Sequence, residues 1–471
     1  MIFNSLAFAI FLPVVLGLYY ALGFRWQNKM LLAASLFFYA WWDWRFLGLL
    51  ALTIFIDYYA SHKVYKATTH RDKKRWMLLS IISNLVVLGI FKYSDFFITS
   101  FASLLHSIGF TVHLPTLALV LPVGISFYTF MSMAYVIDVY RGELKPTTHF
   151  FDFALFVSYF PHLVAGPILR APQLLPQLTK KRNISLGQIR DGVALIIIGY
   201  TRKLVIADLL APYVNGAFKD IDAMGSGDLF VRMFFFAIQL YGDFAGYSDI
   251  ARGVSKLFGI ELNLNFDTPY LSQNITEFWR RWHISLSTWL RDYVYIPLGG
   301  NRKGKARTYI NNFLTMLIGG LWHGANWTFV VWGALNGIYL AVHKLYLDVR
   351  GMKYIPSTRF TFVTPFKMMF MFFLAAFAFL IFRSPDFSTA WHYISRMFSF
   401  TGGMTRFGST LFVMPIVGLW LALDLAQYTS LGERFVSRSM LWQRALVFGV
   451  LFALVLIAGA DNSQPFIYFQ F

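Results

Sequence analysis

The sequence predicts an all-α polytopic membrane protein with about ten to twelve transmembrane or re-entrant helices. Of its 471 residues, 57% are hydrophobic and only 14% are charged. Such a balance is typical of chains that lie mostly within a bilayer. Aromatic residues make up 19% of the chain, as expected where aromatic belts mark both membrane interfaces.

Twelve apolar runs are long enough to cross or enter a bilayer. In chain order they are 3–23, 30–42, 45–60, 76–93, 114–138, 150–168, 191–211, 229–248, 309–345, 361–382, 409–426 and 443–460. The run 150–168 contains two prolines and a histidine, so it is expected to be re-entrant. Residues 1–23 lack a basic N-terminal region and are interpreted as a retained span, not a signal peptide. Residues 1–471 are therefore expected to form a single membrane-embedded domain.

The formal net charge of +18 indicates basic loops that face the cytoplasm and its anionic lipids. The basic stretches 61–75 and 280–307 are expected to be cytoplasmic, and the acidic stretch 220–228 to face outward. Basic residues precede the last span and none follows it, so the C-terminus is predicted outside. Basic residues spread between spans argue against nucleic-acid binding. The chain has no cysteine, which excludes disulfides, thiolate metal sites and a cysteine nucleophile.

Two histidines lie in unusually polar, Trp-rich stretches of the second half. They are His283, within 277–292, and His323, within 321–327. An ionisable group at membrane depth is costly, so both are candidate functional residues. Glycines on both sides of His323 permit close helix packing or a broken helix around a cavity. Its imidazole would serve either as a hydrogen-bond partner for a neighbouring helix or as a general base.

Segment 277–293 is predicted to form one amphipathic helix, because Phe278, Trp282, Leu286 and Trp289 recur at helical spacing. Its other face carries Arg280 and Arg291. Such a helix would either anchor the chain at the cytoplasmic interface or bind an anionic cytoplasmic substrate.

Two further polar or aromatic features stand out. Asp243 and Asp249 lie near the end of the run 229–248, where interface polarity or helix capping is a commoner explanation than acid–base work. Residues 466–471, Phe-Ile-Tyr-Phe-Gln-Phe, read by composition alone as an interfacial aromatic tail. We find no glycine-rich phosphate loop, HExxH or GxSxG motif in a hydrolase context.

The stretches 278–302 and 321–327 are long and specific motifs. Through them the chain resembles the membrane-bound O-acyltransferases, and the stretches 243–249, 165–168 and 39–42 also match that family. The closest branch is the one that O-acetylates alginate and peptidoglycan in bacteria. The resemblance covers nearly the whole chain and implies many helices around a central funnel and tunnel. It also implies that His323 is catalytic and that His283 is the second signature residue, near the cytoplasmic mouth.

The resemblance gives the C-terminal residues a second interpretation. They are similar to the FxYFxF motif that ends the small partner peptide of the teichoic-acid D-alanylation system, whose tyrosine is proposed to carry the acyl group. Tyr468 is the matching position. Residues 466–471 are thus expected to form an extracytoplasmic, acyl-carrier-like tail.

The implied function is transfer of an acetyl group across the bacterial inner membrane for O-acetylation of an exported or cell-envelope polysaccharide. The donor substrate would be a cytoplasmic thioester such as acetyl-CoA, with no bound cofactor or metal. A periplasmic or extracellular polysaccharide acetyltransferase would be the partner. The candidate catalytic residues are His323, His283 and Tyr468, and the candidate substrate- or donor-binding residues are Arg280, Arg281, Arg291, Asn326 and Asp243. Alternatives are D-alanyl transfer to teichoic acid and a non-enzymatic role in polymer export.

Overall fold

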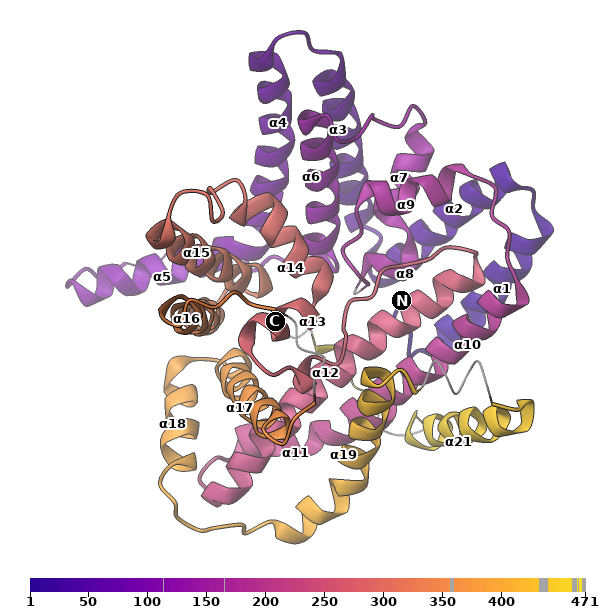
Figure 1. The fold of residues 1–471 in the computed structure, drawn as a ribbon. Coiled ribbons are helices and arrows are strands. Elements are labelled where there is room, and N and C mark those ends of the chain that lie inside the picture. Colours follow the sequence, from indigo (N-terminus) through magenta and orange to yellow (C-terminus); the bar gives the residue numbers. More distant parts are fainter. Residues whose placement is uncertain are drawn as a thin grey trace. The chain divides into compact units, whose positions relative to one another are not determined.

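The computed structural model describes residues 1–112, 114–164, 166–355, 360–431, 439–459, 464, 466 and 467. These residues form helices joined by loops, and no strand occurs among them (Figure 1). The all-α prediction is confirmed. The helices group into two compact units, one of residues 1–196 with 250–263, the other of residues 197–249 with 264–471.

The first unit contains the N-terminal helices and the parts of two long helices that continue into the second. Its elements are α1 (Leu6–Ala21), α2 (Phe24–Asp43), α3 (Phe46–Lys66), α4 (His70–Leu88), η1 (Gly89–Tyr93), α5 (Ser94–Ser107), α6 (Ile125–Arg141), α7 (Phe150–Ser158), α8 (Phe160–Leu163), α9 (Ala171–Thr179), most of α10 (Leu186–Tyr200) and the end of α12 (Ser226–Leu257). Helices α3, α4 and α6 pack as a bundle (Figure 1). Asp57 at its centre is buried and accepts hydrogen bonds from Ser80, Asn84 and Ser132.

The second unit contains the residues of the polar motifs. Its elements are η2 (Thr201–Asp208), α11 (Leu209–Lys219), most of α12, η3 (Pro269–Leu271), α13 (Ile275–Arg281), α14 (Ile284–Leu290), η4 (Arg291–Tyr295), α15 (Lys305–His323), α16 (Trp327–Val349), α17 (Thr364–Arg383), α18 (Phe387–Met397), α19 (Phe407–Tyr428) and α21 (Leu441–Gly459). The element η2 is a π-helical turn that joins α10 to α11.

In the described part of the chain, five helical segments are long and apolar enough to cross a membrane. They are 70–107, α12, α17, α19 and α21. Other predicted runs are divided by breaks. The run 114–138 is helical only from Ile125, because Pro122 and the left-handed Gly124 precede α6. The run 150–168 is divided into α7 and α8 at Tyr159.

The run 309–345 folds as two helices, α15 and α16, that pack against each other with their backbones in contact. A methyl group added at Gly320 would lie 2.3 Å from the Phe329 carbonyl oxygen, and one at Gly333 would lie 2.5 Å from that of Met316. Only glycine permits this approach at either position. The connection at Gly324–Asn326 ends α15 directly after His323. The run is therefore broken after His323, and its glycines serve close helix packing, the first of the two predicted alternatives.

Candidate active site

His283 lies at a sharp break between α13 and α14. Its φ of +42° is in the left-handed region, where a non-glycine residue is uncommon. The buried Asn265 stabilises the break from outside the segment, since its carbonyl oxygen accepts from Ile284 N at 2.9 Å and its side chain from Ser285 Oγ at 2.8 Å. The prediction of one continuous helix over 277–293 is therefore wrong.

The break also turns the aromatic residues of this segment into the protein interior. Trp282 is almost fully buried, stacks on Phe278 with ring centroids 5.7 Å apart, and contacts Phe379 of α17 at 4.9 Å. A tryptophan that anchors a surface helix would keep contact with the lipid interface. The segment is a buried structural element of the second unit, and not a surface helix.

His323 is the last residue of α15 and is also buried. Its ring lies among Trp322, Trp332 and Phe382, with centroid distances of 5.0, 5.0 and 5.4 Å. Helices α15, α16 and α17 each contribute one of these rings. The imidazole thus occupies an aromatic cage with little access to water.

The two histidines, forty positions apart in sequence, are neighbours in space. Their ring centroids are 6.4 Å apart, with an angle of 47° between the ring planes, and Trp322 contacts both rings. His283 is fully buried. Burial lowers the pKa of His283 to about 3, so this imidazole is neutral at physiological pH.

The C-terminal segment reaches the aromatic residues around this histidine pair. The Phe244 ring of α12 lies 4.7 Å from the His283 ring and 5.8 Å from the Phe466 ring. The backbone N–H of Ile467 donates to Asp243 Oδ2 at 2.7 Å. Tyr468, the third candidate catalytic residue, lies outside the described residues.

Two of the candidate donor-binding residues are engaged within the protein. Asp243 forms an ion pair with Lys203 at 2.7 Å, in addition to its bond from Ile467. The Asn326 side chain caps α16 by accepting from Thr328 N at 3.0 Å, and it donates to the Pro385 carbonyl oxygen at 2.7 Å. Their described contacts hold protein segments together.

The three candidate arginines differ in their surroundings. Arg281 pairs with Glu277 at 3.0 Å and with Asp267 at 3.4 Å, so its guanidinium is used within the second unit. Arg280 is exposed and lies over the Tyr354 ring at 4.5 Å. Arg291 is also exposed and pairs with its neighbour Asp292 at 2.6 Å. Exposed guanidinium groups of this kind can bind phosphate.

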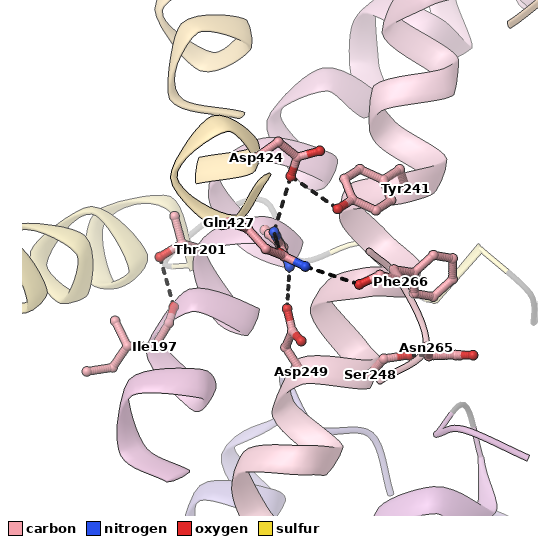
Figure 2. A network of polar contacts seen from close by, with 10 residues as sticks. Ile197, Thr201, Tyr241, Ser248, Asp249, Asn265, Phe266, Asp424 and Gln427 are labelled. Atoms are coloured by element: carbon pink, nitrogen blue, oxygen red, sulfur yellow. Dashed lines mark hydrogen bonds and ion pairs between the residues drawn. The ribbon is translucent and has the colours of Figure 1, made fainter. Parts of the chain in front are cut away.

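A buried polar network next to the site was not predicted (Figure 2). Arg202 of η2 pairs with Asp249 of α12 at 2.5 Å and with Asp424 of α19 at 3.2 Å. It also donates to Gln427 at 2.9 Å, and Tyr241 donates to Asp424 at 3.1 Å. The network therefore ties η2, α12 and α19 together inside the second unit.

The network also supports the site, because Gln427 donates to the carbonyl oxygen of Phe266, whose ring lies 6.0 Å from the His283 ring. Asp243 and Asp249 both belong to buried ion pairs, so the interpretation as interface polarity or helix capping is wrong. A sequence signal was present, since Arg202, Lys203 and Asp208 interrupt the apolar run 191–211. Their partners lie too far away in sequence for this signal to identify them.

Within the described residues, no group of three or more His, Asp and Glu side chains is arranged to hold a metal ion. The described geometry is that of two neighbouring buried imidazoles surrounded by aromatic rings, one of which, Phe244, also contacts Phe466 of the C-terminal segment. Such groups can transfer protons in a site from which water is excluded.

Residues 36–384 match the family described as MBOAT, membrane-bound O-acyltransferase family. The chain is 40% identical to the probable alginate O-acetylase AlgI of Pseudomonas putida, and the match covers 100% of both chains. It is 39% identical to the peptidoglycan O-acetyltransferase of Helicobacter pylori over 74% of this chain and 71% of that relative. It is also 32% identical to the teichoic acid D-alanyltransferase of Streptococcus thermophilus, over 50% and 63% of the two chains.

Proposed function

The chain belongs to the membrane-bound O-acyltransferase family, and from this premise we propose that it transfers an acetyl group from a cytoplasmic thioester to its own Tyr468. The acetyl group is then used for O-acetylation of an exported or cell-envelope polysaccharide. It is a multi-pass membrane acyltransferase. Full-length similarity to a probable alginate O-acetylase, and similarity to a peptidoglycan O-acetyltransferase, support a polysaccharide as the final acceptor.

One observation carries the proposal. The Phe244 ring contacts the His283 ring at a centroid distance of 4.7 Å and the Phe466 ring at 5.8 Å. The histidine pair and the C-terminal segment therefore share an aromatic neighbour. Tyr468 follows Ile467, the last described residue, in the sequence.

In the proposed reaction His323 is the general base. A phenol has a pKa near ~10, so little of it is ionised at neutral pH, and a base within hydrogen-bond reach contributes roughly 10²–10⁴ in rate. The imidazole takes the phenolic proton of Tyr468, and the phenolic oxygen attacks the thioester carbonyl carbon. The carbon–sulfur bond breaks, and the departing thiolate takes the proton from the imidazolium. The products are a tyrosyl acetate ester and a free thiol.

His283 is assigned a different part in this reaction. Because burial lowers its pKa to about 3, it acts as a neutral hydrogen-bonding group. A neutral imidazole next to the reacting carbonyl stabilises the developing oxyanion by donating a hydrogen bond without becoming charged. The centroid distance of 6.4 Å from His323 allows both rings to serve one reacting group.

The donor is proposed to be acetyl-CoA, which carries several phosphates. The exposed guanidinium groups of Arg280 and Arg291 are assigned to bind them. Arg281 contributes less, because Glu277 and Asp267 already engage its guanidinium. Basic residues concentrated in 280–307 favour a cytoplasmic position for this donor end.

The second transfer is assigned to a periplasmic or extracellular acetyltransferase partner. A tyrosyl ester is activated, because phenolate is a better leaving group than a sugar alkoxide, and transfer to a sugar hydroxyl is therefore downhill. This step requires the C-terminus on the outer side of the bacterial inner membrane. The absence of basic residues after 443–460 favours that side.

The two alternatives are less well supported. D-alanyl transfer to teichoic acid is supported by a relative, a teichoic acid D-alanyltransferase, that matches only half of this chain. The non-enzymatic export role is set aside, because the family and the names of the relatives identify the chain as an acyltransferase.

Two substitutions test the proposal. We expect His323→Ala and Tyr468→Phe each to reduce polysaccharide O-acetylation by about 10² or more, the scale of removing a general base or the acyl acceptor. The matched controls are His106→Ala, at an exposed position of α5, and Tyr65→Phe, at an exposed position of α3. Wild-type acetylation by a well-expressed His323→Ala variant would contradict the base role. Wild-type acetylation by Tyr468→Phe would contradict the relay.

A further inference from the structure

A compact group of three charged side chains lies beside the C-terminal segment. Lys203 Nζ is 2.9 Å from Asp208 Oδ1 and 2.7 Å from Asp243 Oδ1. All three side chains are buried. The group has two carboxyl groups for one ammonium, so hydrogen-bond donors other than Lys203 are needed to satisfy the carboxyl oxygens in this buried position.

The backbone of the C-terminal segment supplies those donors. Gln464 N donates to Asp208 Oδ2 at 3.2 Å, and Ile467 N donates to Asp243 Oδ2 at 2.7 Å. In return, Lys203 Nζ donates to the Gln464 carbonyl oxygen at 2.9 Å. Hydrogen bonds that involve a charged partner are about twice as strong as neutral ones. The charged group therefore binds the segment at two points, three residues apart.

An aromatic contact fixes the same segment between these two points. Phe466 is fully buried, and its ring lies 4.4 Å from that of Tyr247 and 5.8 Å from that of Phe244. Tyr247 and Phe244 occupy one face of α12, on the helix that carries Asp243. Polar anchoring and aromatic packing together define a single register for Gln464, Phe466 and Ile467.

We propose that Lys203, Asp208 and Asp243 form a binding site for a peptide backbone, and that its occupant is the C-terminal segment of this chain, held at Gln464, Phe466 and Ile467. The inference rests on the proposed function, because the register of this segment would position Tyr468 for acetylation. The three residues act through the segment and touch no reacting atom, so they are positioning residues.

The site and the segment are closely packed. The cavity lined by Lys203, Asp208, Asp243, Gln464 and Ile467, among others, has a volume of only about 10 Å³. The polar contacts are to backbone atoms of the segment, so they do not depend on its side chains. The rings of Tyr247 and Phe244 supply the selectivity for an aromatic side chain at position 466.

Cysteine labelling tests the site directly, because the chain has no native cysteine. A single cysteine replaces Gln464, whose described contacts to the site come from its backbone. The full-length protein in detergent is treated with a maleimide reagent. We expect Asp243→Ala to raise the labelling rate by roughly tenfold or more, the scale of losing a charge-assisted hydrogen bond. Asp243→Asn keeps an acceptor for Ile467 N, so its labelling rate is expected to lie between those of the parent and of Asp243→Ala.

The matched control is Asp191→Asn in the same Gln464→Cys background, because Asp191 is exposed and pairs only across the surface with Arg190. Its labelling rate is expected to equal that of the parent. Phe466→Ala is the second variant, since it loosens the segment without touching the buried charges, and it too should raise the rate. Unchanged labelling in both Asp243→Ala and Phe466→Ala, in protein that elutes as a single species, would overturn the site.

Labelling does not depend on acetyl transfer, so the proposed peptide-binding site and the proposed acyl-tyrosine relay can be refuted independently. Increased labelling together with normal polysaccharide acetylation by Tyr468→Phe would support the site and contradict the relay. If both are right, Asp243→Asn lowers acetylation of Tyr468 at saturating donor while the donor KM stays unchanged. A purely structural defect would instead lower the melting temperature and change both parameters.

Discussion

The contact between α15 and α16 makes a strong prediction for Gly320→Ala. The added methyl group would lie 2.3 Å from the Phe329 carbonyl oxygen, whereas ordinary contact begins at 3.4 Å. The obstructing atom belongs to the backbone, so α16 must retreat by about 1 Å, at a cost of roughly 1–3 kcal/mol for overpacking. Because His323 lies only one turn further along α15, the displacement reaches the imidazole. A misplacement of about 1 Å can cost roughly 10² in rate.

The assay is polysaccharide O-acetylation per amount of membrane protein, with the apparent melting temperature measured on the same preparation. The matched control is Gly449→Ala in α21, where an added methyl group meets nothing within 4 Å. There the gain in helix propensity, about 1 kcal/mol, should leave stability unchanged or improved. If Gly320→Ala acetylated polysaccharide as well as Gly449→Ala does, the close packing of the two helices would not be what positions His323.

Two further predictions concern buried charge and pH. Arg202→Met leaves the Asp249 and Asp424 carboxylates without their buried cation and should destabilise the fold by about 3–5 kcal/mol, measured as a lower melting temperature. The control Arg190→Met breaks an exposed ion pair and should cost less than about 1 kcal/mol. Equal losses of stability in the two variants would refute the stabilising role of the network. Because the pKa of His283 is about 3 in the folded state and near ~6.5 when unfolded, only the unfolded state binds this proton between these values. Stability should therefore fall as pH drops below about 6.5. His283→Asn, which tolerates the left-handed backbone, should lose less melting temperature between about pH 6.5 and pH 4, and equal losses would contradict the buried neutral histidine.

The positions of the helices could be predicted well from the sequence, because apolar runs report where the chain enters a nonpolar environment. Runs such as 45–60 and 443–460 correspond to α3 and α21 within a few residues. Breaks with a local cause were also visible, as at Gly324 after His323. The break at His283 was not, because it depends on Asn265 and on burial of Trp282.

The sequence identified residues of the candidate site, but it did not predict how they are arranged in space. His283 and His323 stood out because ionisable groups are rare in such a chain, yet helical periodicity placed His283 on a surface helix. The network of Arg202 with Asp424 joins positions 222 residues apart, and Ile467 contacts Asp243 across 224 residues. Pairings of this kind are set by tertiary packing, which a single sequence does not encode in any local pattern. Of the five candidate donor-binding residues, only Arg280 and Arg291 are exposed.

The acyl-tyrosine relay is tested most directly by mass spectrometry of the C-terminal peptide from the full-length protein, isolated from cells that lack the extracytoplasmic partner. Without onward transfer the ester should accumulate. We expect an acetyl group on Tyr468 in the wild-type protein and in His106→Ala, and its loss in His323→Ala. An unmodified Tyr468 in wild-type protein whose cells acetylate their polysaccharide once the partner is restored would contradict the relay.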